Sequence, residues 1–566
     1  MRSILLLLAS FPAWSAAPQT VIVDAEDFYH AMPRGDLMGD ALSLRVPWLH
    51  RNTAVVLRSK ADAVAKIHVP ATGEYHLFVR SQGAADGSSF RIVVGGKSDA
   101  GTYGDGAMQW KRGASYKLAA GALEVKLTGI TPAPALDAIV LTQNTDFREE
   151  DLKSYELPED VALLKEYRTP RPAAVKFGDV NGDGKTDLFV IEPNWSAHVF
   201  DNGGKELWSY TAPVEETRLR AEFEPPGIVW DFDQDGKAEV AHWRLIDNRE
   251  WLVIADGQTG VIKHRVEWPT IPRPHVYNNF RLAVGRMQKG YPSNLIVFTD
   301  SGGTISMTAY TKELKQLWQH VEHKKKDHLG HYIYPVDLDG DGIDEVVVSH
   351  LALNAKGETL WNRFDVFADN HDHADNMQFT DLDGDGKLEI LAGVSDIGVV
   401  VSRALTGEIL WHNMAAHSQQ INFTRILSGK PGPQVAVNGR IYGDRRRGEP
   451  GLAAQVHWFD PGGNLLSIWP ASPLNGNPDF VKGDWRGDGT EALFWFKFRL
   501  GSDGRGTVYF QEPVYHMFDF MGRGAEEVIA TQGGVIRVYG AKSVKEKALV
   551  RDAEYKRLRM ANHTHY

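Results

Sequence analysis

The stretch DLDGDGIDEVVVSH at Asp337–His350 is followed by a near copy, DLDGDGKLEILAGV, at Asp381–Val394. Each copy places three carboxylates on alternate positions of a glycine-bearing turn and continues, after one more acid, into an apolar run. The phrase also occurs as DVNGDGKTD from Asp179 and DFDQDGKAE from Asp231, and it weakens to DWRGDGTE from Asp484 and DFMGRGAEE from Asp519. A phrase that recurs in this way predicts a repeat architecture.

The spacing of the copies gives the number of repeats. Successive copies are 52, 106, 44, 103 and 35 residues apart, so two gaps are close to double the others. A degenerate copy lies inside each double gap: RLAVGRMQKGYPSNLIVF from Arg281 and FTRILSGKPGPQVAV from Phe423. Several units end in a turn and a tryptophan-bearing strand, such as AKGETLWN, LTGEILWH and GGNLLSIW. The content of one unit is that of a four-stranded blade, and eight blades predict a closed β-propeller over residues 173–540.

The remaining segments complete an all-β prediction. Residues 1–17 carry Arg2, an apolar run and a small-x-small site, which indicates a secretory signal peptide. Residues 20–147 alternate polar and apolar positions between glycine turns, which predicts an N-terminal β-sandwich. We expect residues 148–172, which are charged and proline-bearing, to be a linker, and residues 541–566 to be a tail with a short surface helix near Val544–Leu558.

Composition excludes several classes of protein. The chain has 566 residues and a net charge of −11, which argues against nucleic acid as a partner. No stretch has the length of a membrane span. The chain contains no cysteine although its leader predicts export to a secreted or periplasmic location, so disulfides cannot stabilise it. The apolar core, and metal ions if they bind, must do so instead.

The acid phrases predict calcium loops. Oxygen ligands on alternate residues, a glycine for the turn and a closing acid match the hard-oxygen shell that Ca²⁺ prefers. An EF-hand would need glutamate at loop position twelve, where Val190, Val348 or Ala392 stands here. We therefore expect several calcium ions in β-hairpin loops, mainly with a structural role. The predicted ligands are Asp179, Asn181, Asp183 and Asp187; Asp231, Asp233, Asp235 and Glu239; Asp337, Asp339, Asp341 and Glu345; Asp381, Asp383, Asp385 and Glu389.

Histidines concentrate just before the inner strands of the predicted blades. The stretch DNHDHADN at Asp369–Asn376 is the densest, and related positions carry His331, His417 and His516. Equivalent positions of different blades meet on one face of a propeller, so these side chains predict a site there. Each histidine could instead bond to the backbone of a neighbouring blade, and the run Arg445–Arg447 could be a solvated loop.

Two family resemblances refine this prediction. The sandwich, with AEDF, ATGEYHLFVRS, Trp110 and LDAIVLT, resembles carbohydrate-binding modules of families 6 and 35, which implies that Trp110 contacts sugar. The ring resembles FG-GAP and VCBS calcium repeats. More narrowly, IYPVDLDGDGIDEVVVSH, NHDHADNMQFTDLDGDGKLEI and LTGEILWH resemble the eight-bladed rhamnogalacturonan lyases of polysaccharide lyase family 11. The N-terminal module and the first blades depart from that family.

The second resemblance implies an exported lyase that cleaves an acidic, uronate-containing glycan by β-elimination. Such a reaction requires a cation at the uronate carboxylate, a base for the C5 proton and an acid for the departing O4. We expect His373 or His417 as the base, His331 or Tyr332 as its partner, and Arg440 at the carboxylate. His371, Asp375 and Arg445 are further candidates for substrate binding. The alternative is a non-catalytic, calcium-stabilised glycan-binding or adhesion protein; a glycoside hydrolase would need two suitably separated carboxylates.

Overall fold

The computed structural model describes residues 19–563 apart from short gaps, the longest of which are 38–53, 214–223, 270–277, 364–372, 442–451 and 470–479. The described residues form two compact units, one up to residue 154 and the other from residue 155 onward. The predicted signal peptide, residues 1–17, lies outside the described residues.

The N-terminal unit is a β-sandwich, as predicted. One sheet has the strand order β2-β3-β10-β5-β8 with β1 also paired to β10, and the other has the order β4-β9-β6-β7. Its core includes Phe28, Tyr75, Phe90 and Ile139. The strands are β1 (Thr20–Asp24), β2 (Gly35–Leu37), β3 (Val55–Leu57), β4 (Ala63–Val69), β5 (Gly73–Gln82), β6 (Arg91–Val94), β7 (Lys97–Ser98), β8 (Gln109–Leu118), β9 (Gly121–Thr128) and β10 (Ala135–Thr142).

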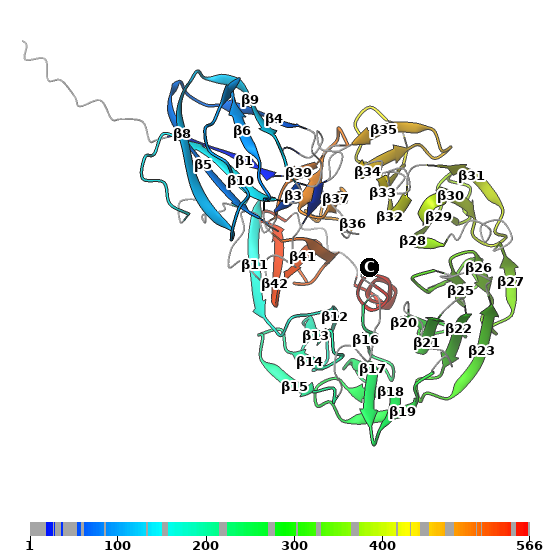
Figure 1. Cartoon of the computed structure of the whole chain (residues 1–566). Helices are drawn as coiled ribbons and strands as arrows, with labels where there is room; N and C mark the ends of the chain where they lie inside the picture. Colours follow the sequence, from blue (N-terminus) through cyan, green and yellow to red (C-terminus); the bar gives the residue numbers. More distant parts are fainter. Residues whose placement is uncertain are drawn as a thin grey trace, which may run out of the picture. The chain divides into compact units, whose positions relative to one another are not determined.

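The second unit is a propeller of eight four-stranded antiparallel sheets, which confirms the predicted blade number. Figure 1 shows the eight sheets around a common axis. The two degenerate repeats found in the sequence, at Arg281 and Phe423, form the inner hairpins of blades 3 and 6.

The strands of each blade run from the axis outward in chain order, except in blade 8. Blades 1 to 4 comprise β12 (Ala174–Gly178), β13 (Asp187–Ile191), β14 (Ala197–Phe200) and β15 (Glu206–Tyr210); β16 (Gly227–Trp230), β17 (Glu239–Ile246), β18 (Arg249–Asp256) and β19 (Ile262–Glu267); β20 (Asn278–Gly285), β21 (Asn294–Ser301), β22 (Thr304–Tyr310) and β23 (Gln316–His323); β24 (Tyr334–Val336), β25 (Glu345–Val348), β26 (Leu351–Leu353) and β27 (Thr359–Asn362).

Blades 5 to 7 comprise β28 (Ala374–Thr380), β29 (Glu389–Val394), β30 (Gly398–Arg403) and β31 (Ile409–Asn413); β32 (His417–Thr424), β33 (Gln434–Ile441), β34 (Leu452–Phe459) and β35 (Leu465–Trp469); β36 (Phe480–Gly483), β37 (Ala492–Trp495), β38 (Phe498–Leu500) and β39 (Gly506–Val508). Blade 8 comprises β40 (Val514–Phe518), β41 (Glu527–Gln532), β42 (Val535–Ala541) and β11 (Val161–Arg168). A short 3₁₀ helix, η6 (Ser395–Ile397), joins β29 to β30.

The sequence pattern explains why the strands take these places. Strands in the middle of a blade, such as β13 and β25, are buried along their whole length and are apolar after their first residue, which is the closing acid of the preceding loop. Outer strands such as β19 and β23 alternate between partly buried and exposed positions. A strand covered on both faces requires a continuous apolar run, whereas an edge strand with one wet face requires alternation.

The expected linker proves to contain a strand of the ring. Within residues 148–172, Val161–Arg168 form β11, which pairs antiparallel with β42, with Val161 opposite Ala541 and Arg168 opposite Val535. Blade 8 is therefore built from both ends of the propeller sequence. The distant strand gives blade 8 its fourth strand and pairs with β42, which would otherwise be an unpaired edge, and this requirement explains why a charged, proline-flanked segment is extended and paired.

The expected surface helix at Val544–Leu558 is also corrected. Among the described residues the helix starts later, as α3 (Ala553–Lys556), and continues into η7 (Arg557–Ala561), which has π-helical bonding. Arg557, Met560 and Ala561 are buried rather than exposed. The segment lies on the axis of the ring, where η7 contacts the inner strands β12, β16, β20 and β40 (Figure 1). We call residues 551–563 the C-terminal plug.

Neighbouring blades are joined by a repeated contact between tryptophan and glycine. The indole N–H of Trp208, Trp318, Trp361 or Trp411 donates to a turn carbonyl of the next blade, at 2.8–3.0 Å. A glycine of that turn packs directly against each indole ring. These glycines are Gly260, Gly357, Gly407 and Gly463. At the junction of blades 8 and 1, Tyr167 takes this role, because its hydroxyl donates to the Asn202 carbonyl at 3.0 Å and Gly204 lies beside its ring.

This contact predicts a specific sensitivity to added bulk. A Cβ at Gly407 would lie 2.8 Å from the Trp361 ring, whereas a Cβ at Gly429 would meet nothing within 4 Å, and both glycines have φ near +68°. We expect Gly429→Ala to lower the free energy of unfolding by about 1 kcal/mol through backbone strain. Gly407→Ala should lower it by about 3 kcal/mol, because overpacking adds to that strain. Equal losses in denaturant unfolding would contradict the tryptophan contact.

Candidate functional site

The ring has two chemically distinct faces. His331 and His373 precede the inner strands β24 and β28, whereas the acid phrases follow the inner strands as turns into the second strands. Since the inner strands share one direction, the histidines and the acid loops lie at opposite ends of the axis. A cavity of about 480 Å³ lies between, lined by inner strands of blades 4 to 8 and by Leu558, Arg559, Asn562 and His563 of the C-terminal plug.

Each acid loop is organised by its first carboxylate. In blade 4, Asp337 Oδ1 accepts the N–H groups of Gly340 and Asp341, and Oδ2 accepts that of Gly342, at 2.8–3.1 Å. The closing acid, Glu345, accepts the N–H of Leu338 at 2.9 Å. Glu239 and Glu389 make the same bond to Phe232 and Leu382. The phrase thus folds into one reproducible turn that gathers carboxylates.

Three of the four predicted ligand sets converge. Ligand atoms lie within 4.8 Å of one another in the sets Asp231, Asp233 and Glu239; Asp337, Asp339 and Glu345; and Asp381, Asp383 and Asp385. In the loop of blade 1, both carboxylate oxygens of Asp187 accept backbone N–H groups, from Val180 and Asn202. That loop is formed by the same backbone bonds, with Asp179 accepting from Gly182, Asp183 and Gly184.

The loops differ in their neutralising charges. Lys263 Nζ contacts Glu239 at 2.5 Å and Asp233 at 3.0 Å in blade 2, and the Arg403 guanidinium contacts Asp383, Asp385 and Glu389 in blade 5. Among the described residues, no basic side chain pairs with the set of blade 4. There, burial and the neighbouring carboxylates raise the pKa of Glu345 to about 7. The blade 4 set, made only of oxygen donors, fits a hard divalent cation.

The histidine face holds a second converging group. His373 Nε2 lies 2.8 Å from His331 Nε2, and Asp375 Oδ1 lies 3.2 Å from His331 Nε2 and 3.7 Å from His373 Nε2. Asp375 also accepts from the Ser395 hydroxyl at 2.6 Å. His331 and Asp375 are 2 % and 1 % exposed, and the His373 side chain is 12 % exposed. The structure thus brings together three residues that the sequence predicted for the site, from two blades.

This arrangement limits which of the three side chains can carry a proton. Burial alone would raise the pKa of Asp375, but His373 and His331 hold it well below its usual value. Two N–H groups cannot face each other at 2.8 Å, so the facing nitrogens share one proton and one ring presents a lone pair. The group can therefore act as a base, and its nitrogen and oxygen atoms, all within 4.8 Å, also form a possible metal-ligand set.

The other predicted site residues are placed as follows. Tyr332 is buried, with the Arg281 guanidinium 5.2 Å from the centre of its ring. His417 opens β32 opposite Arg440 of β33 and is not a member of the converging group. Of Arg440, only the backbone is described, and His371 and Arg445 lie outside the described residues.

Trp110 belongs to the N-terminal unit. It lies on β8 with its ring edge-on to Phe147 at 5.2 Å, and its N–H donates to Glu149 at 3.2 Å. These contacts hold the indole against its own sheet. Sugar binding by Trp110 stays a prediction.

Sequence reasoning missed a buried ionic group beside the axis. Lys176 of β12 pairs with Glu224 at 2.9 Å, and Glu224 also accepts from the Tyr515 hydroxyl at 2.9 Å. Arg281 donates to the Glu224 carbonyl, and Lys176 donates to the carbonyl of His563 in the plug. One signal was available, because Lys176 interrupts the otherwise apolar stretch AAVKFG of an inner strand. Its partners are distant in sequence and could not be assigned.

A comparison with models of protein families matches one part of the propeller. Residues 179–242 match the model of the FG-GAP-like repeat. This match covers the acid loops of blades 1 and 2.

Two curated relatives match a longer part of the chain. The chain is 23 % identical over 356 residues to the rhamnogalacturonan endolyase YesW of Bacillus subtilis (strain 168), covering 51 % of this chain and 56 % of the relative. It is 25 % identical over 310 residues to the rhamnogalacturonan exolyase YesX of the same organism, covering 42 % of this chain and 49 % of the relative. The chain therefore spans about half the length of the curated relatives it matches.

The solved structures agree on the fold. The crystal structure of rhamnogalacturonan lyase YesW superposes with a TM-score of 0.54 at 17 % identity, covering 85 % of this chain and 92 % of the other. The rhamnogalacturonan lyase PL11 of Bacillus licheniformis gives 0.54 at 16 % identity, covering 88 % and 97 %. These two curated relatives and two solved structures are all rhamnogalacturonan lyases, the family that the sequence resembles.

The lowered pKa of Asp375 predicts how its stabilising effect depends on pH. Because the folded-state pKa lies below the unfolded value of 3.8, the stabilisation is complete above that value and is lost as the pH falls through the folded-state pKa. At pH 5, Asp375→Asn should cost about 3 kcal/mol, because it leaves the buried His331 and the partly buried His373 without their carboxylate. The cost should shrink toward pH 3. Denaturant unfolding at both values measures it, with the exposed Asp247→Asn as control, and a pH-independent cost would contradict the assignment.

Proposed function

We propose that this protein is an exported polysaccharide lyase that cleaves an acidic, uronate-containing glycan of the rhamnogalacturonan type by β-elimination. One observation carries the proposal: His331, His373 and Asp375, from two adjacent blades, converge at the end of the axis opposite the acid loops. A buried group of this composition costs stability, and such groups are concentrated at functional sites. The rhamnogalacturonan lyases among its relatives support the same reaction.

The roles follow from the proton that the two histidines share. His373, the more accessible of the pair, is the proposed base that accepts the C5 proton. His331 and Asp375 stabilise the resulting imidazolium, and His331 or Tyr332 returns a proton to the departing O4. Arg440, which stands opposite His417 in the β32–β33 pair, is the proposed cation for the uronate carboxylate.

The same three side chains suggest a second role for the group. Two imidazoles and a carboxylate whose donor atoms lie within 4.8 Å of one another could together hold a divalent cation. A bound cation would neutralise the uronate carboxylate and so acidify the C5 proton. In that case His373 is a ligand and the base lies elsewhere on the face.

The acid loops have a structural part in this proposal. We assign calcium to them, with blade 4 as the strongest site because its acids lack a basic partner among the described residues. Calcium bound by folded loops adds its binding free energy to the stability of the ring, which suits an exported chain with no cysteine. None of the described helices is long and apolar enough to cross a membrane.

Lyase activity is tested by the ultraviolet absorbance of unsaturated uronate products released from rhamnogalacturonan. We expect His373→Ala to lower kcat at least about 100-fold, because it removes the base, when both proteins are assayed well below the melting temperature of the variant. The control is His323→Ala, an exposed histidine on outer strand β23. Glycan binding without any absorbance rise in the wild type would instead support the non-catalytic alternative. Loss of one bound metal ion in His373→Ala would support the ligand role.

Removal of divalent ions should destabilise the ring. We expect a calcium chelator to lower the melting temperature by several degrees, because it removes calcium ions that bind only to the folded loops. Glu345→Gln should lower the melting temperature in calcium and reduce the effect of the chelator. The control is the same chelator saturated with calcium. An unchanged melting temperature after full metal removal would contradict the assignment of calcium to the loops.

A further inference from the structure

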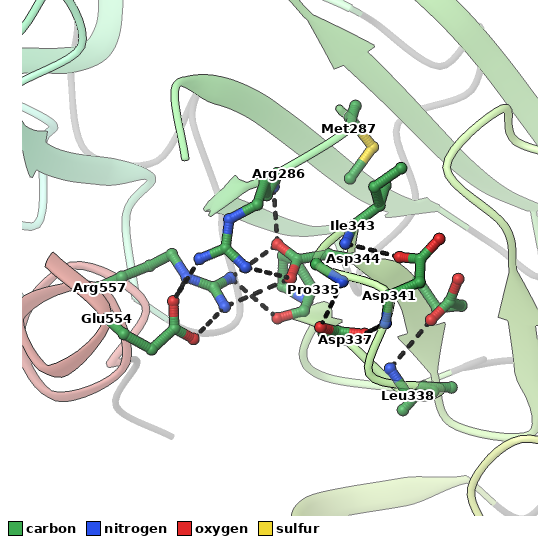
Figure 2. Close-up of polar contacts among 12 residues, drawn as sticks. Arg286, Met287, Pro335, Asp337, Leu338, Asp341, Ile343, Asp344, Glu554 and Arg557 are labelled. Carbon is green, nitrogen blue, oxygen red and sulfur yellow. Dashed lines mark hydrogen bonds and ion pairs between the residues drawn. The ribbon is translucent and has the colours of Figure 1, made fainter. Parts of the chain in front are cut away.

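The C-terminal plug is held on the axis by a small number of charged contacts. Arg557 is 1 % exposed, and its guanidinium donates to Asp344 at 2.9 Å, to the Pro335 carbonyl at 3.1 Å and to the Val284 carbonyl at 3.3 Å. Glu554 pairs with Arg286 at 2.7 Å. Figure 2 shows Arg557 and Glu554 facing Arg286, Pro335 and Asp344. Asp344 is thus one of the carboxylates that hold the plug in place.

Asp344 belongs to an acid loop. It lies between Asp341 and the closing acid Glu345 of blade 4, and it is fully buried. Its backbone N–H donates to the Arg286 carbonyl at 2.8 Å, and its carboxylate accepts the Arg286 N–H at 2.6 Å. Because Asp344 and Glu345 are adjacent, the loop cannot rearrange around Glu345 without moving the carboxylate that holds Arg557.

Blade 4 is distinctive in this respect among the four acid loops. The position of Asp344 is Thr186, Ala238 or Leu388 in blades 1, 2 and 5, so none of those loops offers a carboxylate there. Blades 2 and 5 also carry Lys263 and Arg403 against their acids, as described above. Glu345, 8 % exposed, instead turns a carboxylate oxygen toward Asp337 and Asp339 with no basic side chain paired to it among the described residues. Of these loops, blade 4 most needs a cation and holds the plug through a carboxylate, whereas the blade 1 loop contacts the plug through the Thr186 hydroxyl, which accepts from Arg551 at 3.4 Å.

We propose that cation binding to the blade 4 loop and docking of the C-terminal plug are thermodynamically linked. The bound cation holds the repelling carboxylates of Asp337, Asp339 and Glu345 in one turn, and this turn fixes Asp344 for Arg557. In return, the docked plug holds Asp344 in place and prepares the loop for the ion. The inference rests on the calcium assigned to this loop in the proposed function, not on the reaction.

The linkage extends across the ring. Arg557 lies on the side of the acid loops, while Asn562 and His563 line the axial cavity, and His563 accepts from Lys176. An ion bound on one face therefore stabilises a segment that lines the cavity between the two faces. This makes the plug a positioning element for the interior of the ring.

The test uses amide hydrogen exchange of residues 551–563, followed by mass spectrometry on the full chain. In the wild type, we expect calcium removal to speed exchange of the plug about ten-fold, a typical coupling between two sites. Asp339→Asn, which removes a loop ligand that touches no part of the plug, should speed exchange similarly in calcium. The matched control is Asp383→Asn in the blade 5 loop, which should leave the plug as slow as in the wild type.

Linkage also requires the reciprocal effect. Arg557→Met should weaken calcium binding to the blade 4 loop, measured by titration calorimetry against Asp339→Asn, by the same factor of about ten. Slow exchange of the plug in Asp339→Asn, or unchanged calcium affinity in Arg557→Met, would overturn the proposal. So would equal acceleration in Asp383→Asn, which would indicate general destabilisation. Calcium-dependent exchange in a protein without lyase activity would overturn the proposed reaction and support the linkage.

Discussion

A ring of eight sheets leaves a hole on its axis, and the way this chain fills that hole constrains the rest of the molecule. The inner strands present one face to the axis, so the filling segment must satisfy several neighbours at once, among them β12, β16, β20 and β40. The C-terminal plug does this with two arginines that reach outward: Arg557 to Asp344 and two carbonyls, and Arg559 to Glu526, Lys482 and Met517. Burying such charges is unfavourable unless every donor finds an acceptor. The pairing therefore fixes one position of the helix where apolar packing alone would allow several.

Contacts between neighbouring blades also fix the arrangement of the ring. Two sheets that share only apolar faces could shift relative to each other. At these junctions the indole N–H bonds to one carbonyl of the next blade, and a glycine leaves room for the indole ring. Together these contacts fix the relative position of the two blades. Tyr167 reproduces the contact at the closing junction, from a strand that precedes the first blade. The polar groups of the site gain from this rigidity, because His331 and His373 come from adjacent blades and meet only if the blades keep their spacing.

Much of this fold could be predicted because its signals are local. The acid turns, their spacing and the tryptophan strands were sufficient for eight blades, and the histidines before the inner strands pointed to the face on which His331, His373 and Asp375 meet, but not to which of them meet there. Pairings between distant segments could not be predicted. β11 has the composition of a linker and becomes a strand because β42 needs an edge partner. Arg557 looks like a surface residue of a basic tail until Asp344 meets it. Lys263 and Arg403 come from strands that follow their loops, and no pattern within the acid phrase indicates them.

The strand β11 also determines when the molecule can be completed. It is synthesised before any blade, yet its partner β42 is among the last strands to emerge. Seven blades can form in order behind it, but the ring stays open until the end of the chain arrives, and the plug that occupies the axis arrives later still. Contacts between such distant parts of a sequence form slowly. Because the ring cannot close early, the growing polypeptide keeps β11 without its partner β42 until its last strands have been made.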